Sequence, residues 1–145
     1  MSSAMTLSER EAFLAQPRVA ILAIARFDRG PLAVPVWYLY EPGGAIRIST
    51  AGASLKTRLL LLAGRASLVV QNPQPPYQYV SVEGPIARIE PAQLERDVRP
   101  LAVRYLGPEA GERYLAHIGG PAAGAGDVVV TLTPEHWIAR HEPVD

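Results

Sequence analysis

The chain has 145 residues, which fits one domain, and 48% of them are hydrophobic, enough to build a packed core. Fourteen basic residues balance fourteen acidic ones, so no excess positive charge points to nucleic acid or to an anionic membrane as a partner. Cysteine is absent, which excludes disulfides and thiolate metal sites. The apolar runs are too short to cross a bilayer, and no leader peptide opens the chain, so we expect a cytoplasmic protein.

The first half of the chain predicts one helix, three strands and a second short helix. Thr6 and Glu9 have capping-box spacing at the start of a helix over 6–15. Pro35 lies inside the second expected strand, over 32–40, and predicts that this strand is an edge strand or contains a bulge. Ser54 is the expected N-cap of the second helix, over 54–62, and Gly64 its expected end. The strands expected here cover 18–27, 32–40 and 45–50.

The second half predicts further strands around one long helix. A strand over 77–89 is expected to bend near Gly84-Pro85. A helix is expected over 91–106, helical turns over 112–118, and a Gly/Ala-rich loop over 119–126. The other strands expected here cover 66–71, 127–133 and 137–140. Six or seven strands with short outer helices favour a mainly β (α+β) class, an antiparallel barrel in a single domain over 1–145.

The segment Ser54-Leu55-Lys56-Thr57-Arg58 carries the clearest local pattern for binding. A helix start already bears partial positive charge, so a lysine and an arginine there are misplaced unless an anion lies nearby. A phosphate suits this position, because backbone N–H groups, the Ser54 and Thr57 hydroxyls and the Lys56 ammonium can converge on it. Taken alone, the pentapeptide favours an ordinary capped surface turn.

The segment Pro35-Val36-Trp37-Tyr38 is the second candidate. A proline-interrupted strand leaves backbone groups free for the polar edge of a ring, and Trp37 offers flat apolar contact. A tryptophan that packs in the core or at a dimer interface is the alternative.

The remaining residues suggest no catalytic machinery of the protein's own. His117, His136 and His141 lack the spacing of a metal site, and no nucleophile stands beside a matched base. We therefore identify no catalytic residue and expect no metal. If the protein is an enzyme, a cofactor performs the chemistry.

The order of segments resembles the flavin-binding split-barrel superfamily, the pyridoxamine 5′-phosphate oxidase-like proteins. The resemblance covers roughly residues 7 to 90. The matching segments are Val19–Ala25, Pro35-Val36-Trp37-Tyr38, Ile48-Ser49-Thr50, Ser54 to Arg58, 66–70 and Tyr79 to Gly84. It implies a split β-barrel, and a homodimer with the cofactor at the subunit interface.

The resemblance also implies which residues hold the cofactor. The ring would lie along Val36 and Trp37, with Pro35 shaping the backbone. The phosphate and its chain would lie at the strand end and the helix start. Residues near Tyr79 or Trp137 would complete the partner's site. The full set of expected cofactor-binding residues is Pro35, Val36, Trp37, Ser49, Thr50, Ser54, Lys56, Thr57, Arg58, Gln71, Tyr79 and Trp137.

The arginine-rich substrate and C-terminal elements of true pyridoxamine phosphate oxidases are missing. The compact form and the Lys-Thr-Arg run look closer to the branch that uses the deazaflavin coenzyme F420. The composition points the same way: 13 of the 14 basic residues are arginine, as in a GC-rich, actinobacterial genome. The resemblance thus implies an F420-dependent oxidoreductase that transfers a hydride to a small conjugated substrate.

Two alternatives stay open. One is an FMN-dependent oxidoreductase on the same fold. The other is a non-catalytic protein that carries a cofactor or a tetrapyrrole.

Overall fold

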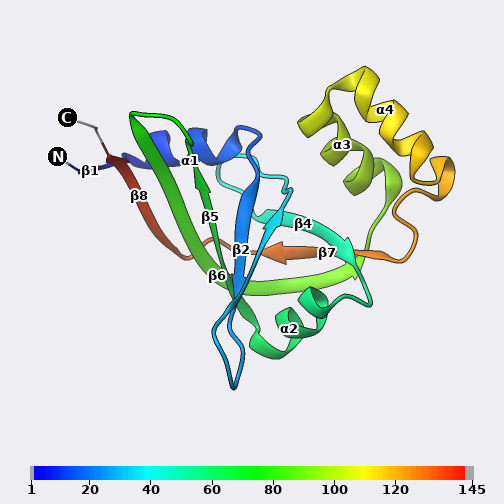
Figure 1. Cartoon of the computed structure of the whole chain (residues 1–145), viewed down its shortest axis with the longest axis horizontal. Helices are drawn as coiled ribbons and strands as arrows, with labels where there is room; N and C mark the ends of the chain where they lie inside the picture. Colours follow the sequence, from blue (N-terminus) through cyan, green and yellow to red (C-terminus); the bar gives the residue numbers. More distant parts are fainter. Residues whose placement is uncertain (1, 143–145) are drawn as a thin grey trace.

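The computed structural model describes residues 2–142, which form an antiparallel sheet of eight strands with four α-helices (Figure 1). The strands are β1 (Ser3–Ala4), β2 (Ala20–Ile24), β3 (Leu32–Val36), β4 (Ile46–Ala51), β5 (Arg65–Gln71), β6 (Tyr77–Pro91), β7 (Asp127–Leu132) and β8 (His136–Glu142). The helices are α1 (Leu7–Ala15), α2 (Leu55–Ala63), α3 (Arg99–Leu106) and α4 (Pro108–His117), with a π-helical turn η1 (Leu94–Val98) and a 3₁₀ turn η2 (Gly120–Ala122).

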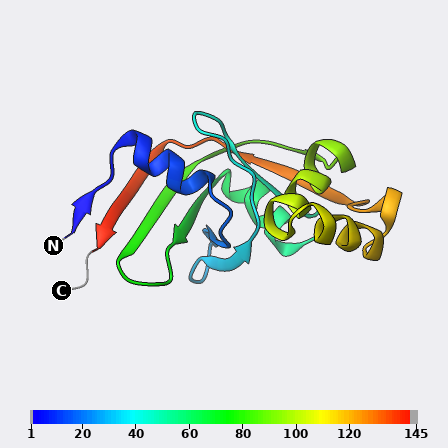
Figure 2. The same cartoon turned by 90° about the horizontal axis from the view of Figure 1, so that it is seen from above.

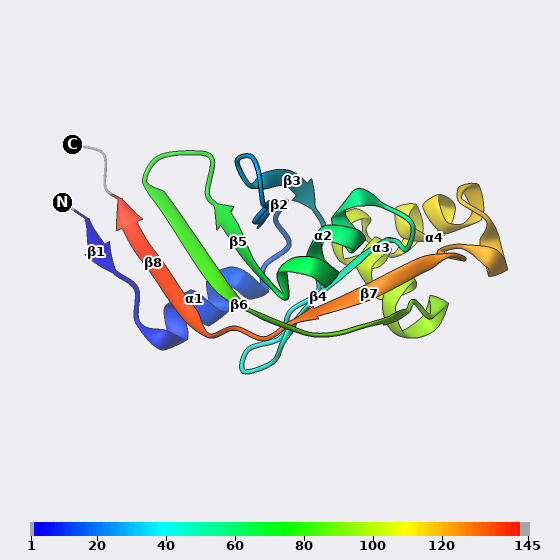
Figure 3. The same ribbon diagram turned by 90° about the horizontal axis from the view of Figure 1, so that it is seen from below.

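The long strand β6 divides the sheet into two parts. Its first half pairs with β8 through residues 77–83 and with β5 through residues 79–85. Its second half, from Ile86 to Pro91, pairs with β7. Beyond β7 lies β4, and beyond β5 lie β2 and the edge strand β3. Figure 3 shows β6 passing from one part to the other. The sheet is therefore an open split barrel of the α+β class, and the expected bend at Gly84-Pro85 is confirmed.

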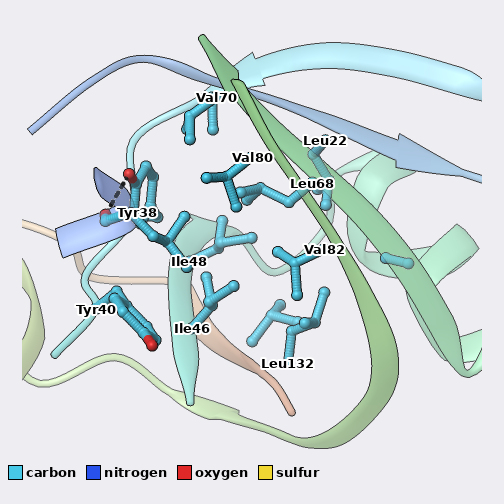
Figure 4. Close-up of a cluster of buried hydrophobic side chains, with 14 of the residues drawn as sticks. Leu22, Tyr38, Tyr40, Ile46, Ile48, Leu68, Val70, Val80, Val82 and Leu132 are labelled. Carbon is cyan, nitrogen blue, oxygen red and sulfur yellow. Dashed lines mark hydrogen bonds between the residues drawn. The ribbon is translucent and has the colours of Figure 1, made fainter. Parts of the chain in front are cut away.

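Alternating apolar side chains fill the space between the two parts of the sheet (Figure 4). Leu22, Ile48, Leu68 and Val82 are almost fully buried there, as the period of two along each strand requires. Tyr38 joins them, and its hydroxyl donates to the carbonyl of Leu14 at 2.6 Å. Burial raises the pKa of Tyr38 to about 12. This hydrogen bond ties α1, which lies across β8 and β6 in Figure 2, to the core.

Local patterns located the helix ends well. Thr6 and Glu9 form the expected capping box at the start of α1. Ser54 caps α2 by accepting the N–H of Thr57, and Gly64 ends it in the left-handed conformation at φ 70°. Pro35 lies in β3 at the edge of the sheet, where a missing N–H costs no ladder hydrogen bond.

Several expected boundaries were wrong. The strand over 32–40 ends at Val36, and only an isolated bridge from Leu39 to Arg47 continues its course. The helix over 91–106 begins at Leu94 because β6 extends to Pro91 through its pairing with Val128. The short strand β1 was not expected, since two residues carry no readable period. These features depend on pairing between distant segments, which local sequence does not encode.

The helical hairpin of α3 and α4 lies beside the barrel and has a small core of its own (Figure 1). Asp97 anchors it to the sheet. This carboxylate is fully buried and accepts hydrogen bonds from Arg47 of β4 at 2.9 Å, from Arg96 at 3.0 Å and from the N–H of Gln93 at 2.9 Å. The anchor fixes η1 and α3 over the outward face of β4.

Candidate functional site

A cavity of about 270 Å³ opens between the sheet, the start of α2 and the helical hairpin. The end of β3 meets the end of β4 and the first turn of α2 in it. The expected cofactor residues that line it are Pro35, Val36, Trp37, Ser49, Thr50 and Lys56. Half of the residues selected from sequence therefore share one cavity.

Lys56 lines this cavity, and the first turn of α2 that carries it has two backbone N–H groups without a helical acceptor. Lys56 forms no ion pair with any residue between 2 and 142 and is partly exposed. The N–H groups of Leu55 and Lys56 occupy the first two helical positions, so they have no acceptor inside the helix. Together with the helix dipole, these groups can bind an anion.

The hydroxyls of Ser54 and Thr57 act differently from the expectation. Thr57 donates its hydroxyl proton to the carbonyl of Ala51 at 2.9 Å, and the two hydroxyl oxygens lie 3.1 Å apart. Because Thr57 has one proton to give, Ser54 is the donor between them. Both protons are thus used within the capped helix start. Neither Ser54 nor Thr57 lines the cavity.

Stacked aromatic rings form one wall of the cavity. Trp37 stacks on Tyr105 with 4.7 Å between ring centroids and 4° between planes, and Tyr114 is tilted against Trp37 at 6.1 Å. The Tyr105 hydroxyl donates to the carbonyl of Arg18 at 2.7 Å and accepts the N–H of Tyr38 at 3.2 Å. These hydrogen bonds fix Tyr105, and Tyr105 fixes the plane of Trp37.

The helical hairpin supplies lining residues that sequence reasoning missed. Val98, Leu101 and Ala102 face the cavity from η1 and α3, and Tyr114 and Ile118 face it from α4 and the residue that follows α4. The spacing of Val98, Leu101 and Ala102 follows one face of a helix. That spacing identifies an apolar face but not the strand on which it packs.

Asp127 is the one carboxylic acid among the residues that line this cavity. Burial raises the pKa of Asp127 above its ordinary value. The residue lies at the start of β7, opposite Ala51 of β4. Asp127 therefore takes up a proton at a higher pH than an exposed aspartate does.

Four other expected residues lie outside the cavity in this chain. Arg58 is exposed on α2. Gln71 and Tyr79 oppose each other at the far end of the β5–β6 pair. Trp137 packs against Tyr40 at 6.5 Å, beneath the guanidinium of Arg10. None of these four residues lines the cavity within one chain.

Two absences hold for the part of the chain that the structure describes. Among residues 2–142, no three His, Asp or Glu side chains gather as a metal site would require. No helix in that range has the length and apolar character needed to cross a bilayer.

The sheet divided at β6, with a cavity at the end of β4 and the start of α2, has the architecture of the flavin-binding split barrels. Residues 7–141 match the family model described as pyridoxamine 5′-phosphate oxidase. The chain belongs to this family, whose members are generally flavin-binding oxidoreductases.

Solved structures agree with this assignment. An F420 reductase is 25% identical with a TM-score of 0.72, and the match covers 88% of this chain and 94% of that one. A conserved hypothetical protein from Mycobacterium tuberculosis is 22% identical with a TM-score of 0.76, over 95% and 86% of the two chains. The FAD and heme binding protein from Mycobacterium smegmatis is 16% identical with a TM-score of 0.69, over 99% and 76%. The similarity to the last two proteins shows that they have the same fold as this chain. No curated protein matches the sequence.

Proposed function

We propose that the protein is an oxidoreductase that binds the deazaflavin coenzyme F420 and uses it to reduce a small conjugated substrate. One observation carries this proposal: the end of β3, the end of β4 and the start of α2 bring six expected cofactor residues into one cavity. The 25% identity to an F420 reductase over most of both chains supports the choice of cofactor.

The residues present fit a molecule with a flat ring and a phosphate. Lys56 and the first N–H groups of α2 would hold the phosphate, and Ser49 and Thr50 would lie along the connecting chain. Val36 and the fixed plane of Trp37 would lie beside the ring. When bound, the deazaflavin supplies a hydride donor, which no side chain of this protein can provide.

The chain's own residues would orient the reactants and exclude water. The apolar side chains of Val98, Leu101 and Ala102 close the cavity on the side of the hairpin. Asp127 is the one carboxyl group among the lining residues, and burial raises its pKa. The protein's contribution is thus positioning with limited acid–base work.

A second copy of the chain would complete the site. A cavity of about 270 Å³ is below the range of roughly 300–1,000 Å³ for small-molecule sites. Leu61 and Leu62 on α2 are 65% and 84% exposed, and Ile21 on β2 is 40% exposed. We propose that a homodimer covers this apolar surface and that partner residues close the cavity over the ring.

FMN is the second candidate cofactor. The matching family model is that of pyridoxamine 5′-phosphate oxidase, and an anionic phosphate on a flat ring would use the same groups of this cavity. A purified protein that is yellow and releases FMN on denaturation would favour this cofactor. A colourless protein that binds added deazaflavin would favour F420.

Replacing Lys56 with alanine should weaken binding of either cofactor by about 1.5–3 kcal/mol, the range for a hydrogen bond to a charged group. This corresponds to roughly a 10- to 150-fold rise in Kd. Fluorescence titration of the purified variant with F420 and FMN measures it. The matched control is Arg58→Ala, which removes an exposed cation two residues away and should leave Kd nearly unchanged. Equal Kd values for Lys56→Ala and the wild type would rule out the phosphate position.

A further inference from the structure

A second cavity, of about 710 Å³, lies on the other side of α3 from the first. Arg47 of β4 lines it, whereas Ser49 of the same strand and face lines the first cavity. The charged residues that line the second cavity are Arg47, Arg88, Arg96 and Arg104, with Glu41 and Glu90. Arginine is thus concentrated in one cavity of a chain whose net charge is zero.

The floor of this cavity is a row of three side chains on neighbouring strands. Thr131 of β7 is paired with Arg47 of β4 on one side and with Arg88 of β6 on the other. Residues paired across antiparallel strands point to the same face of a sheet. The two guanidinium groups therefore flank a hydroxyl, and two positive charges on one face disfavour each other unless an anion lies between them.

A β-bulge places Arg88 in this row. Ile86 pairs with Leu132 and Arg88 pairs with Thr131, so β6 holds one extra residue between them. Regular pairing would set Arg88 opposite Val130, a fully buried core residue. Bulges of this kind re-aim side chains near functional sites. Arg88 is exposed and forms no ion pair with the described residues 2–142.

The helical side of the cavity adds a second pair of arginines. Arg96, Pro100 and Arg104 recur every four residues, so they form one stripe along η1 and α3. Arg104 donates to the carbonyls of Ala15 and Gln16, but its Nε is buried and has no hydrogen-bond partner. A ligand cannot reach this buried nitrogen. Arg104 instead gives the cavity a positive charge that forms no ion pair with the described residues 2–142.

Acidic residues neutralise only part of this charge. Asp97 lies beneath the cavity and pairs with Arg47 and Arg96, each at 2.9 Å. Glu90 pairs with Arg96 at 3.4 Å. Arg47 bonds Asp97 through one terminal nitrogen, and its side chain is 36% exposed, so part of its guanidinium remains available.

We infer that this cavity binds a small molecule that carries two or more carboxylate or phosphate groups. Guanidinium groups bind both oxyanions through paired hydrogen bonds. The row of Arg47, Thr131 and Arg88 holds one anionic group, and the stripe on α3 holds another. This site is separate from the proposed cofactor cavity, because α3 stands between them.

Isothermal titration of the purified protein with citrate and with inorganic phosphate tests the inference. The wild type should bind citrate more tightly than phosphate, and Arg88→Gln should weaken citrate binding by about tenfold or more. The matched control is Arg113→Gln, an exposed arginine of α4 outside both cavities, and it should bind citrate like the wild type. The Arg88→Gln variant should retain its affinity for FMN and F420.

The Lys56→Ala variant distinguishes binding in one cavity from binding in the other. It should bind citrate like the wild type, since Lys56 lines only the other cavity. Loss of citrate binding in Lys56→Ala but not in Arg88→Gln would overturn the inference. Absence of citrate binding to the wild type at concentrations on the order of 10 mM would overturn it as well.

Discussion

The Asp97→Ala variant is expected to lose about 3 kcal/mol of unfolding free energy. Removing one partner of a buried ion pair costs roughly 3–5 kcal/mol. The lower end applies because Arg47 and Arg96 are 36% and 40% exposed, so water can solvate them once the carboxylate is gone. The N–H of Gln93 also loses its acceptor.

Denaturant unfolding measures the loss, and hydrogen exchange locates it. Exchange should accelerate most in η1, α3 and α4, since Asp97 anchors this hairpin to β4. The matched control is Asp28→Ala, whose carboxylate is 70% exposed and pairs with Arg29 at 3.5 Å. Its effect should stay within about 0.5 kcal/mol. Equal losses in the two variants would contradict the anchoring role.

The same carboxylate makes stability depend on pH. Burial alone would raise the pKa of Asp97, but hydrogen bonds from Arg96 and Gln93 and the charges of Arg96 and Arg47 outweigh it, so the pKa lies below its ordinary 3.8. A lowered pKa contributes stability that is present above the unfolded value and is lost as pH falls through the folded value. Below about pH 4 the wild type should therefore lose stability more steeply than Asp97→Asn.

The Gly84→Ala variant is expected to lose about 3 kcal/mol or more, or to fail to fold. A Cβ at Gly84 would lie 1.7 Å from the carbonyl oxygen of Thr133 and 2.9 Å from its carbonyl carbon. Both atoms belong to backbone, so neither can rotate away. The approach is fixed by hydrogen bonds from the N–H of Thr133 to Pro85 and from the N–H of Glu135 to Glu83. To avoid the clash, the connection between β7 and β8 would have to move away from the bend of β6, and these hydrogen bonds would break.

Thermal melting with a glycine control checks this prediction. Gly30 lies in the exposed turn between β2 and β3, and a Cβ there would meet nothing within 4 Å. Gly30→Ala should therefore change stability by no more than about 0.5 kcal/mol. A Gly84→Ala protein as stable as the wild type would show that the crossing of these segments is looser than the structure indicates.

Much of the barrel could be predicted from sequence because its determinants are local. Thr6, Ser54 and Gly64 mark helix ends through capping chemistry, and Gly84-Pro85 marks the bend of β6. The start of α2 was singled out as a candidate anion site for a similar reason: a cation in the first turn of a helix is unfavourable without an anion.

The rest of the site depends on which distant segments meet. Val98, Leu101 and Tyr114 follow an apolar period, but long-range contacts such as the ion pair of Arg47 with Asp97 place their hairpin over β4. The bulge that directs Arg88 outward follows from the register of β6 on β7. The register of one strand on another and the packing of a hairpin on a sheet depend on tertiary contacts, which cannot be derived from a single sequence.

Titration of the purified wild-type protein with F420 and with FMN, followed by fluorescence, tests the central claim most directly. The account predicts saturable binding of both ring-phosphate molecules, with the lower Kd for F420. The absence of saturable binding of either molecule at concentrations on the order of 1 mM would contradict the assignment of this cavity to a flavin-type cofactor.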